Sequence, residues 1–91
     1  MLYEALSNAV LARHAEVVEL LISNGADVNF LDYSIRPPII SAIYSGNINI
    51  LRSVLEHGAD VERTASIGFP PLLVAVFFDN VEMVELLLRY G

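Results

Sequence analysis

The 91-residue chain contains no cysteine and no lysine. The absence of cysteine excludes disulfide bonds, a thiolate nucleophile and the ligand set of a zinc finger. Five scattered arginines stand against 11 acidic residues, which gives a formal net charge of −6. Binding to nucleic acid requires a stripe of basic side chains that releases counterions. We therefore expect no nucleic-acid partner.

Long apolar runs are also missing, although 55% of the residues are hydrophobic and the mean hydropathy is +0.55. The strongest candidate for a membrane span, residues 17–22, is far too short to cross a bilayer and is interrupted by Glu19. No basic segment precedes an apolar run near the N-terminus, as a secretory signal would require. We expect an intracellular protein, in the cytoplasm or the nucleus, that contacts no membrane.

What the sequence does contain is a repeat of 33 residues. The string Gly25-Ala26-Asp27-Val28 returns as Gly58-Ala59-Asp60-Val61, and Gly91 follows at the same interval. Pro37-Pro38 likewise returns as Pro70-Pro71. A period of this length in so short a chain indicates a stack of similar units that share one continuous core.

Apolar residues keep the same register in all three units. The columns that define this register are Leu6/Ile39/Leu72, Ala9/Ala42/Ala75, Val17/Ile50/Met83, Val18/Leu51/Val84, Leu21/Val54/Leu87 and Ile22/Leu55/Leu88. Charged residues stand between these columns. We expect the column of Leu21, Val54 and Leu87 to be enclosed and structural.

Each unit is predicted to form two short helices followed by a loop. Pro38 and Pro71 suit the first position of the first helix, because proline presets φ there and its missing N–H has no partner to lose. The preceding prolines, Pro37 and Pro70, are biased towards an extended conformation. The first helices are therefore expected at about residues 39–45 and 72–78.

The second helix of each unit has signals at both ends. Asn47 and Asn80 stand where it begins, and asparagine is a strong N-cap. His14 occupies the same column in the first unit, so capping explains it as well. Gly25 and Gly58 end the helix, where the chain often needs a positive φ that glycine adopts without strain.

The residues after these glycines, 26–36 and 59–69, lack a helical period and indicate a projecting turn or hairpin. Two helices and an extended loop in 33 residues, with Glu-Val-Val-Glu-Leu-Leu-Ile-Ser-Asn-Gly-Ala-Asp-Val-Asn at 16–29, resemble the ankyrin repeat. The resemblance covers essentially the whole chain. It implies an all-α solenoid, a single domain over residues 1–91 with a partial unit at 1–24 and further units at 25–57 and 58–91.

No residue pattern points to catalysis. His57 stands in the last turn of a helix, where the dipole favours a cation. Neither His57 nor His14 has a serine or carboxylate at the spacing of a known nucleophile arrangement. The carboxylate pairs Glu16/Glu19 and Glu82/Glu85 are expected on an exposed helix face, and no glycine-rich phosphate loop is present. We predict a protein that is not an enzyme and that holds no cofactor and no metal.

The resemblance implies a surface that binds another protein. In ankyrin repeat proteins the partner usually contacts the concave face, which consists of the loop tips and the exposed side and end of each unit's first helix. By column, the residues predicted there are Leu11, Tyr33, Ser34, Arg36, Tyr44, Ser45, Ser66, Ile67, Phe69, Phe77 and Phe78. Aromatic residues beside an arginine fit the composition of interface hot spots. The alternative is that Phe77 or Phe78 packs between helices.

The ends of the stack support other possibilities. A terminal repeat normally has a polar outer face, yet the segment 81–88 is largely apolar. We expect either that the natural protein continues beyond it or that this face packs on another molecule, and we favour the first. The alternative functions are a structural element that self-assembles through its end faces and a regulatory part of a larger protein.

The resemblance also implies one modification site. Leu21 followed by Asp27-Val28-Asn29 is similar to the sequence that an asparaginyl hydroxylase recognises in ankyrin repeats, and Asn29 would be the modified residue. Glu62 occupies this column in the next unit and could not be a substrate. The alternative is that Asn29 only stabilises its loop through local hydrogen bonds.

Overall fold

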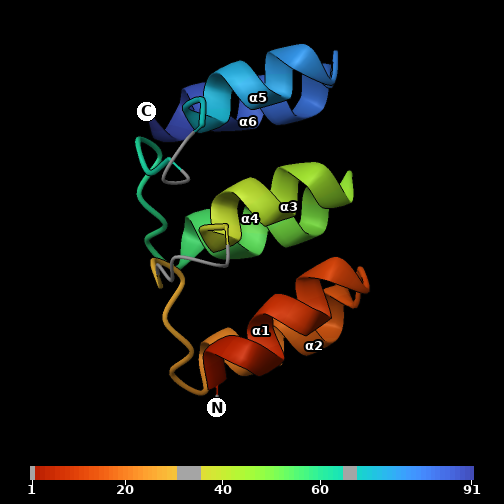
Figure 1. Ribbon diagram of the computed structural model, residues 1–91, viewed down its shortest axis with the longest axis vertical. Helices are drawn as coiled ribbons and strands as arrows, with labels where there is room; N and C mark the ends of the chain where they lie inside the picture. Colours follow the sequence, from red (N-terminus) through yellow and green to blue (C-terminus); the bar gives the residue numbers. More distant parts are fainter. Residues whose placement is uncertain (1, 31–35, 65–67) are drawn as a thin grey trace.

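The computed structural model describes residues 2–30, 36–64 and 68–91. They form six α-helices: α1 (Leu2–Leu11), α2 (Ala15–Ser23), α3 (Pro38–Ser45), α4 (Ile48–Glu56), α5 (Pro71–Phe77) and α6 (Val81–Tyr90). Figure 1 shows three helix pairs stacked one on another, with the two termini at opposite ends of the stack. The described residues include no β-strand. The predicted all-α stack of helix pairs is confirmed.

The first helices of the second and third units begin at proline, as predicted. Pro38 and Pro71 lie in the first turn of α3 and α5. The residues before them, Pro37 and Pro70, are extended, with ψ of 144° and 154°. These helices therefore start one residue earlier than expected, and α5 ends at Phe77.

Two of the three second helices are capped by asparagine. The side-chain oxygen of Asn47 accepts hydrogen bonds from two backbone N–H groups of the first turn of α4, at 2.9 and 3.4 Å. That of Asn80 accepts one from Met83 at 3.1 Å. His14 stands at the same position before α2, but its side chain makes no capping hydrogen bond. The capping role expected of His14 is therefore wrong, because an imidazole ring does not fold back on the backbone as a short amide does.

Gly25 and Gly58 end α2 and α4 in the left-handed conformation, with φ of 101° and 91°. The N–H of Gly25 donates to the carbonyl of Ile22, and the N–H of Ala26 donates to that of Leu21, both at 3.0 Å. The same pair of bonds recurs at Gly58. This double closure satisfies carbonyls that the helix end leaves open, and the predicted role of both glycines is confirmed.

The turn between the two helices of each unit contains a left-handed residue that sequence reasoning did not predict. Gly46 has a φ of 72°, and its counterparts one interval away, Arg13 and Asp79, have φ of 62° and 54°. Glycine adopts this conformation freely, whereas a residue with a Cβ atom pays about 1–2 kcal/mol. The first and third units therefore hold backbone strain that the middle unit avoids.

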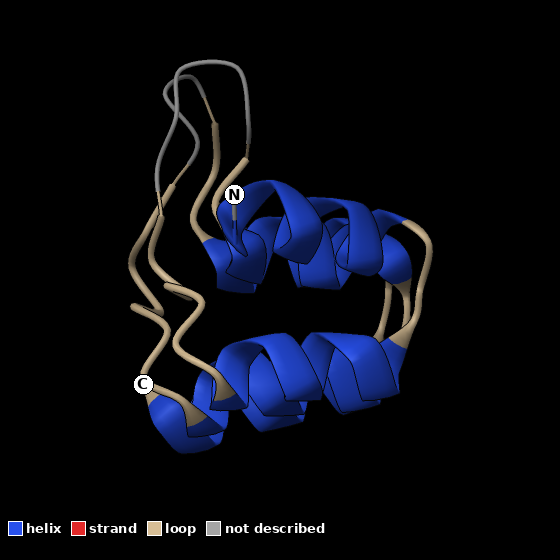
Figure 2. Ribbon diagram, turned by 90° about the horizontal axis from the view of Figure 1, so that it is seen from below, coloured by secondary structure: helices blue, strands red, loops and turns tan. Residues whose placement is uncertain are grey.

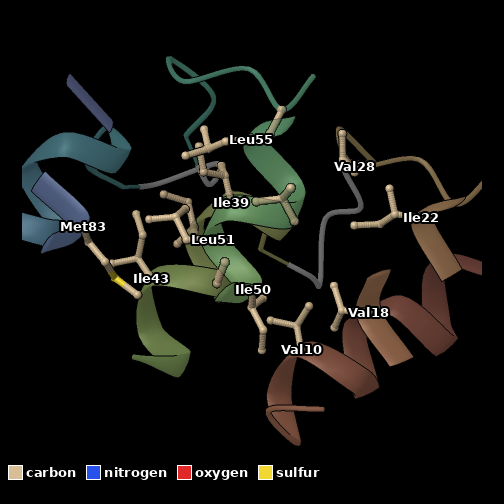
Figure 3. Close-up of a cluster of buried hydrophobic side chains, with 14 of the residues drawn as sticks. Val10, Val18, Ile22, Val28, Ile39, Ile43, Ile50, Leu51, Leu55 and Met83 are labelled. Carbon is tan, nitrogen blue, oxygen red and sulfur yellow. The ribbon is translucent and has the colours of Figure 1, made fainter. Parts of the chain in front are cut away.

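The core forms where each helix pair closes on its neighbours. The middle unit is the most completely enclosed, and its side chains with almost no exposure include Ile39, Ile43, Ile50, Leu51 and Val54. Figure 3 shows Val10 and Val18 of the first unit close to Ile50, and Met83 of the third unit beside Ile43. One apolar core therefore runs through all three units.

The two ends of this core are open. In the first unit Val17 is 44% exposed and Leu21 is half-buried, whereas their counterparts in the next two units are buried. At the other end Leu88 is 60% exposed, and its counterparts are buried. The expectation that Leu21 is enclosed like Val54 and Leu87 is therefore wrong, because no helix pair lies on its outer side.

Replacing Gly46 by alanine is expected to lower the free energy of unfolding by about 1 kcal/mol, because the methyl group strains a left-handed residue. No atom lies within 4 Å of the position that the new Cβ would take, so the loss comes from the backbone alone. Arg13→Ala is the control, since Arg13 is already strained, and it should change stability little. Urea unfolding of both variants measures the difference, and equal stability of the two variants would contradict the assignment.

Leu87→Ala should destabilise the protein more than Leu21→Ala, although the two leucines share a column. Leu87 is 4% exposed, and removal of an enclosed leucine side chain costs about 2–5 kcal/mol. Leu21 is half-buried, so its truncation leaves a site that water can reach and costs less. Thermal unfolding of the two variants compares the losses, and a larger loss at Leu21 would show that the open end has been misidentified.

Candidate functional site

The candidate site lies on the layer formed by the first helix of each unit. Figure 2 shows two layers of helices, one of which holds the N-terminal helix α1 and the other the C-terminal helix α6. With the pairing in Figure 1, the first layer consists of α1, α3 and α5, and the second of α2, α4 and α6. We call the outer surface of α1, α3 and α5 the first-layer face.

Four aromatic side chains gather on this face over the second and third units. Tyr44 is the penultimate residue of α3, Phe77 ends α5, Phe78 follows α5, and Phe69 precedes the proline pair that starts α5. We call Tyr44, Phe69, Phe77 and Phe78 the aromatic cluster. Arg36, which precedes the proline pair of α3, lies on the cluster with its guanidinium carbon 4.0 Å from the centre of the Tyr44 ring.

The contacts within the cluster repeat from one unit to the next. Arg36 and Phe69 occupy one column, and Tyr44 and Phe77 occupy another. Arg36 packs on Tyr44, and Phe69 packs edge-on against Phe77 with ring centres 5.2 Å apart. Phe78 joins the two units, because its ring meets that of Tyr44 edge-on at 5.1 Å. Edge-to-face packing of this kind stabilises ring pairs beyond the area that they bury.

These rings remain open to solvent despite their mutual contacts. Their exposed fractions are 46% for Tyr44, 55% for Phe69, 63% for Phe77 and 50% for Phe78. The alternative that Phe77 or Phe78 is enclosed between helices does not fit this exposure. Contiguous exposed apolar surface of this kind is typical of sites that bind another molecule.

Most of the acidic side chains that lie on helices belong to the other layer, and Glu4 on α1 is the exception. Five of the 11 acidic residues lie on α2, α4 and α6: Glu16, Glu19, Glu56, Glu82 and Glu85. Helices α3 and α5 contain no Asp, Glu, Lys or Arg. The charged residues nearest to the cluster along the chain are Arg36 itself and Asp79, which follows Phe78. The cluster is therefore an apolar surface with a cation at one edge, although the chain as a whole is acidic.

The other residues predicted for this surface fall into three groups. Leu11 is 67% exposed at the end of α1, in the column of Tyr44 and Phe77, but outside the ring contacts. Ser45 is used locally, because its hydroxyl donates to the carbonyl of Ala42 at 2.5 Å and accepts from the N–H of Asn47 at 3.1 Å. The remaining four lie outside the described residues: Tyr33, Ser34, Ser66 and Ile67.

One aromatic pair was missed by the sequence analysis. Tyr3 on α1 stacks on Phe30, with ring centres 4.0 Å apart and planes inclined by 13°. Tyr3 belongs to the column of Arg36 and Phe69, so extending that column to the first unit would have found it. Both Tyr3 and Phe30 are half-buried, and their contact ties the first loop to α1.

Glu19, Ser53 and His57 come together between the first and second units. The Ser53 hydroxyl donates to Glu19 Oε1 at 3.3 Å, and His57 Nε2 lies 3.5 Å from Glu19 Oε2. His57 Nδ1 faces the backbone carbonyl of Ser53 at 2.9 Å. Neither ring nitrogen pairs with the Ser53 hydroxyl, which is buried and donates to the Glu19 carboxylate instead, so the three residues lack the serine–histidine contact of a catalytic triad. Glu19 was expected to be a solvated surface residue, but it links two units instead.

Asn29 links the loop that follows α2 to the segment that follows α4. Its side-chain N–H donates to the carbonyl of Gly58 at 3.0 Å, and its side-chain oxygen accepts from the N–H of Asp60 at 2.7 Å. Its backbone N–H donates to the Asp27 carboxylate at 2.8 Å, a local bond that Glu62 repeats with Asp60. The local bond therefore depends on the Asp27 side chain, whereas the Asn29 side chain bonds to residues about 30 positions away rather than within its own loop.

Comparison with known proteins supports the fold. A sequence model of the ankyrin repeat family, with three copies of the repeat, matches residues 6–91. No individual curated sequence matches the chain significantly.

None of the described helices is long and apolar enough to cross a membrane, and no group of three or more metal-binding side chains occurs among the described residues. Ankyrin repeats are generally protein–protein interaction modules and typically lack enzymatic activity. With three stacked helix pairs, glycine-capped second helices and a family match over nearly its whole length, the chain belongs to the ankyrin repeat family.

Proposed function

We propose that this protein is a non-enzymatic binding module whose partner, another protein, contacts the first-layer face and the adjoining loops. The observation that supports the proposal most directly is the aromatic cluster, whose four rings touch in pairs across two units and yet stay about half exposed. An intracellular location is part of the same proposal.

The physical basis of the binding is surface that is already ordered. The rings of the aromatic cluster are held by one another and by helices α3 and α5, so little side-chain freedom remains to be lost when a partner docks. Transfer of their exposed apolar area out of water is favourable by about 25 cal/mol per Å², and the part of this that exceeds the cost of association appears as affinity. Aromatic and arginine side chains dominate the energetics of protein interfaces for these reasons.

Self-assembly by stacking of end faces is disfavoured by the charges that it would bring together. Arg52 of α4 shares a surface hollow with Glu82 and Glu85 of the next unit. In the third unit, Glu85 occupies the column of Arg52. If a second copy stacked on the third unit, its Glu16 and Glu19 would occupy the columns of Glu82 and Glu85 and would therefore face Glu85. The favourable grouping of charges inside the molecule would become a cluster of carboxylates at the junction between copies. A different protein is therefore favoured as the partner over a second copy of this chain.

The double substitution Tyr44→Ala and Phe77→Ala is expected to weaken partner binding by about tenfold or more, because it removes two ordered rings from the centre of the surface. The control is Leu20→Ala with Val81→Ala, since these side chains are 63% and 65% exposed on the other layer. Proteins retained by each immobilised variant from an extract of the native cells are quantified by mass spectrometry, and far-UV circular dichroism checks helicity. Equal retention by the two double variants would refute the proposed surface.

Hydroxylation of Asn29 stays a prediction. Both polar atoms of its side chain are engaged between units, so the hydroxylase would have to act on a transiently opened loop or before the chain folds. Mass spectrometry of protein purified from its native cells should find one added oxygen on the peptide that contains Asn29 and none on the peptide that contains Glu62. An unmodified Asn29 in such a preparation would dispose of the prediction.

A further inference from the structure

We infer that the partner presents an extended segment in which a carboxylate lies about three residues from a bulky apolar side chain, with Arg36 binding the carboxylate and the Phe69–Phe77 pair binding the apolar group. The inference rests on the proposed function and names the chemistry that the first-layer face recognises. The residues of this site lie in the second and third units, among the residues that the structure describes.

The Arg36 guanidinium keeps N–H donors available for a ligand. Its guanidinium packs on the Tyr44 ring, with 4.0 Å between the guanidinium carbon and the ring centre. Stacking engages the flat face of a guanidinium and leaves the N–H donors around its edge. Arg36 is exposed, and neither the salt bridge of Arg63 with Asp60 nor the contact of His57 with Glu19 includes it. Asp27 lines the same surface hollow as Arg36. The Arg36 guanidinium is suited to a bidentate bond with a carboxylate.

The Tyr44 ring on which Arg36 packs is held in place by the third unit. Phe78 packs edge-on against Tyr44, so the ring under Arg36 is itself held by the third unit. An arginine side chain pays up to about 2 kcal/mol of rotamer freedom when it is immobilised. Part of that cost is already met in the unbound protein. Arg36 is therefore better prepared to receive a ligand than an arginine that projects freely into water.

The charges around the aromatic cluster affect which charged ligand can approach Arg36. The protein is acidic overall, but helices α3 and α5 contain no acidic residue, and five carboxylates lie on the opposite layer. On the side of Arg36, Asp27 lines the same surface hollow as Arg36, and Asp79 follows Phe78. Two packed helix layers are about 8–10 Å apart, comparable with the Debye length of about 8 Å at physiological salt. Repulsion from the far layer is therefore only partly screened, and a carboxylate would have to be held by direct contact with Arg36. A basic segment, by contrast, would be repelled by Arg36. Arg36 also covers the face of the Tyr44 ring to which a cation of the segment would otherwise bind.

The distance between the Arg36–Tyr44 pair and the Phe69–Phe77 pair suits a short stretch of extended chain. Arg36 on Tyr44 and Phe69 on Phe77 are equivalent pairs in adjacent units. Adjacent packed helices lie about 8–10 Å apart, and an extended chain advances about 3.3 Å per residue. A segment that crosses the units therefore moves from one pair to the next in about three residues. Since the second pair is purely aromatic, the residue that reaches it should be bulky and apolar.

The test uses the full chain and a phage-displayed library of random peptides. Peptides enriched on the immobilised protein should share an acidic residue about three positions from a bulky apolar one. Their affinities for the protein and for Arg36→Gln are then compared by fluorescence anisotropy, with Arg89→Gln on α6 as the matched control. We expect a loss of about tenfold for Arg36→Gln, a smaller loss for Arg36→Lys and none for the control. Replacing the acidic residue of the peptide by its amide should add little to the loss in Arg36→Gln.

The outcomes separate this inference from the proposed function. Peptides whose binding is lost with Phe77→Ala but unchanged with Arg36→Gln would overturn the inference and leave the first-layer face as the binding surface. Peptides enriched in basic residues would overturn it as well. Enriched peptides that bind both variants as well as the unmodified protein would place binding elsewhere and refute both proposals. A library that yields no binder counts against the inference.

Discussion

The structure depends on the contact between neighbouring helix pairs. A single pair of eight- or nine-residue helices, such as α3 and α4, has apolar residues on both of its broad faces and cannot enclose either of them alone. The middle unit, covered on both sides, has the most completely buried side chains. The first and third units are covered on one side and leave their outer columns open. Stability in such a stack is a sum over interfaces rather than a property of any one unit.

Much of the fold could be predicted because its signals are local. Proline at the start of α3 and α5, asparagine at the start of α4 and α6, and glycine after α2 and α4 each act through their own backbone geometry. The left-handed residues Arg13 and Asp79 could not be predicted, because neither side chain favours that conformation as glycine does. The enclosure of Leu21 was misjudged because a column shows which side chains are apolar but not whether a neighbour covers them.

The candidate site was predicted in part. The column logic placed Tyr44, Phe69 and Phe77 on one surface, and the structure brings them there as exposed side chains. The stacking of Arg36 on Tyr44 and the edge contact of Phe78 depend on side-chain rotamers, which a column does not determine. The grouping of Glu19 with Ser53 and His57 depends on contacts between residues more than 30 positions apart.

The two junctions between successive helix pairs, each taken with the loop that follows it, are built from different forces. The first has polar links, in which Asn29 bonds to Gly58 and Asp60, and Glu19 meets Ser53 and His57. At the second, Glu62 replaces the asparagine and cannot donate to a carbonyl, whereas Tyr44 and Phe78 supply a ring contact. Water can replace the hydrogen bonds of the first junction, whereas the ring contact of the second removes apolar surface from water. A solvent that dissolves apolar groups therefore acts on the ring contact of the second junction more than on the polar links of the first.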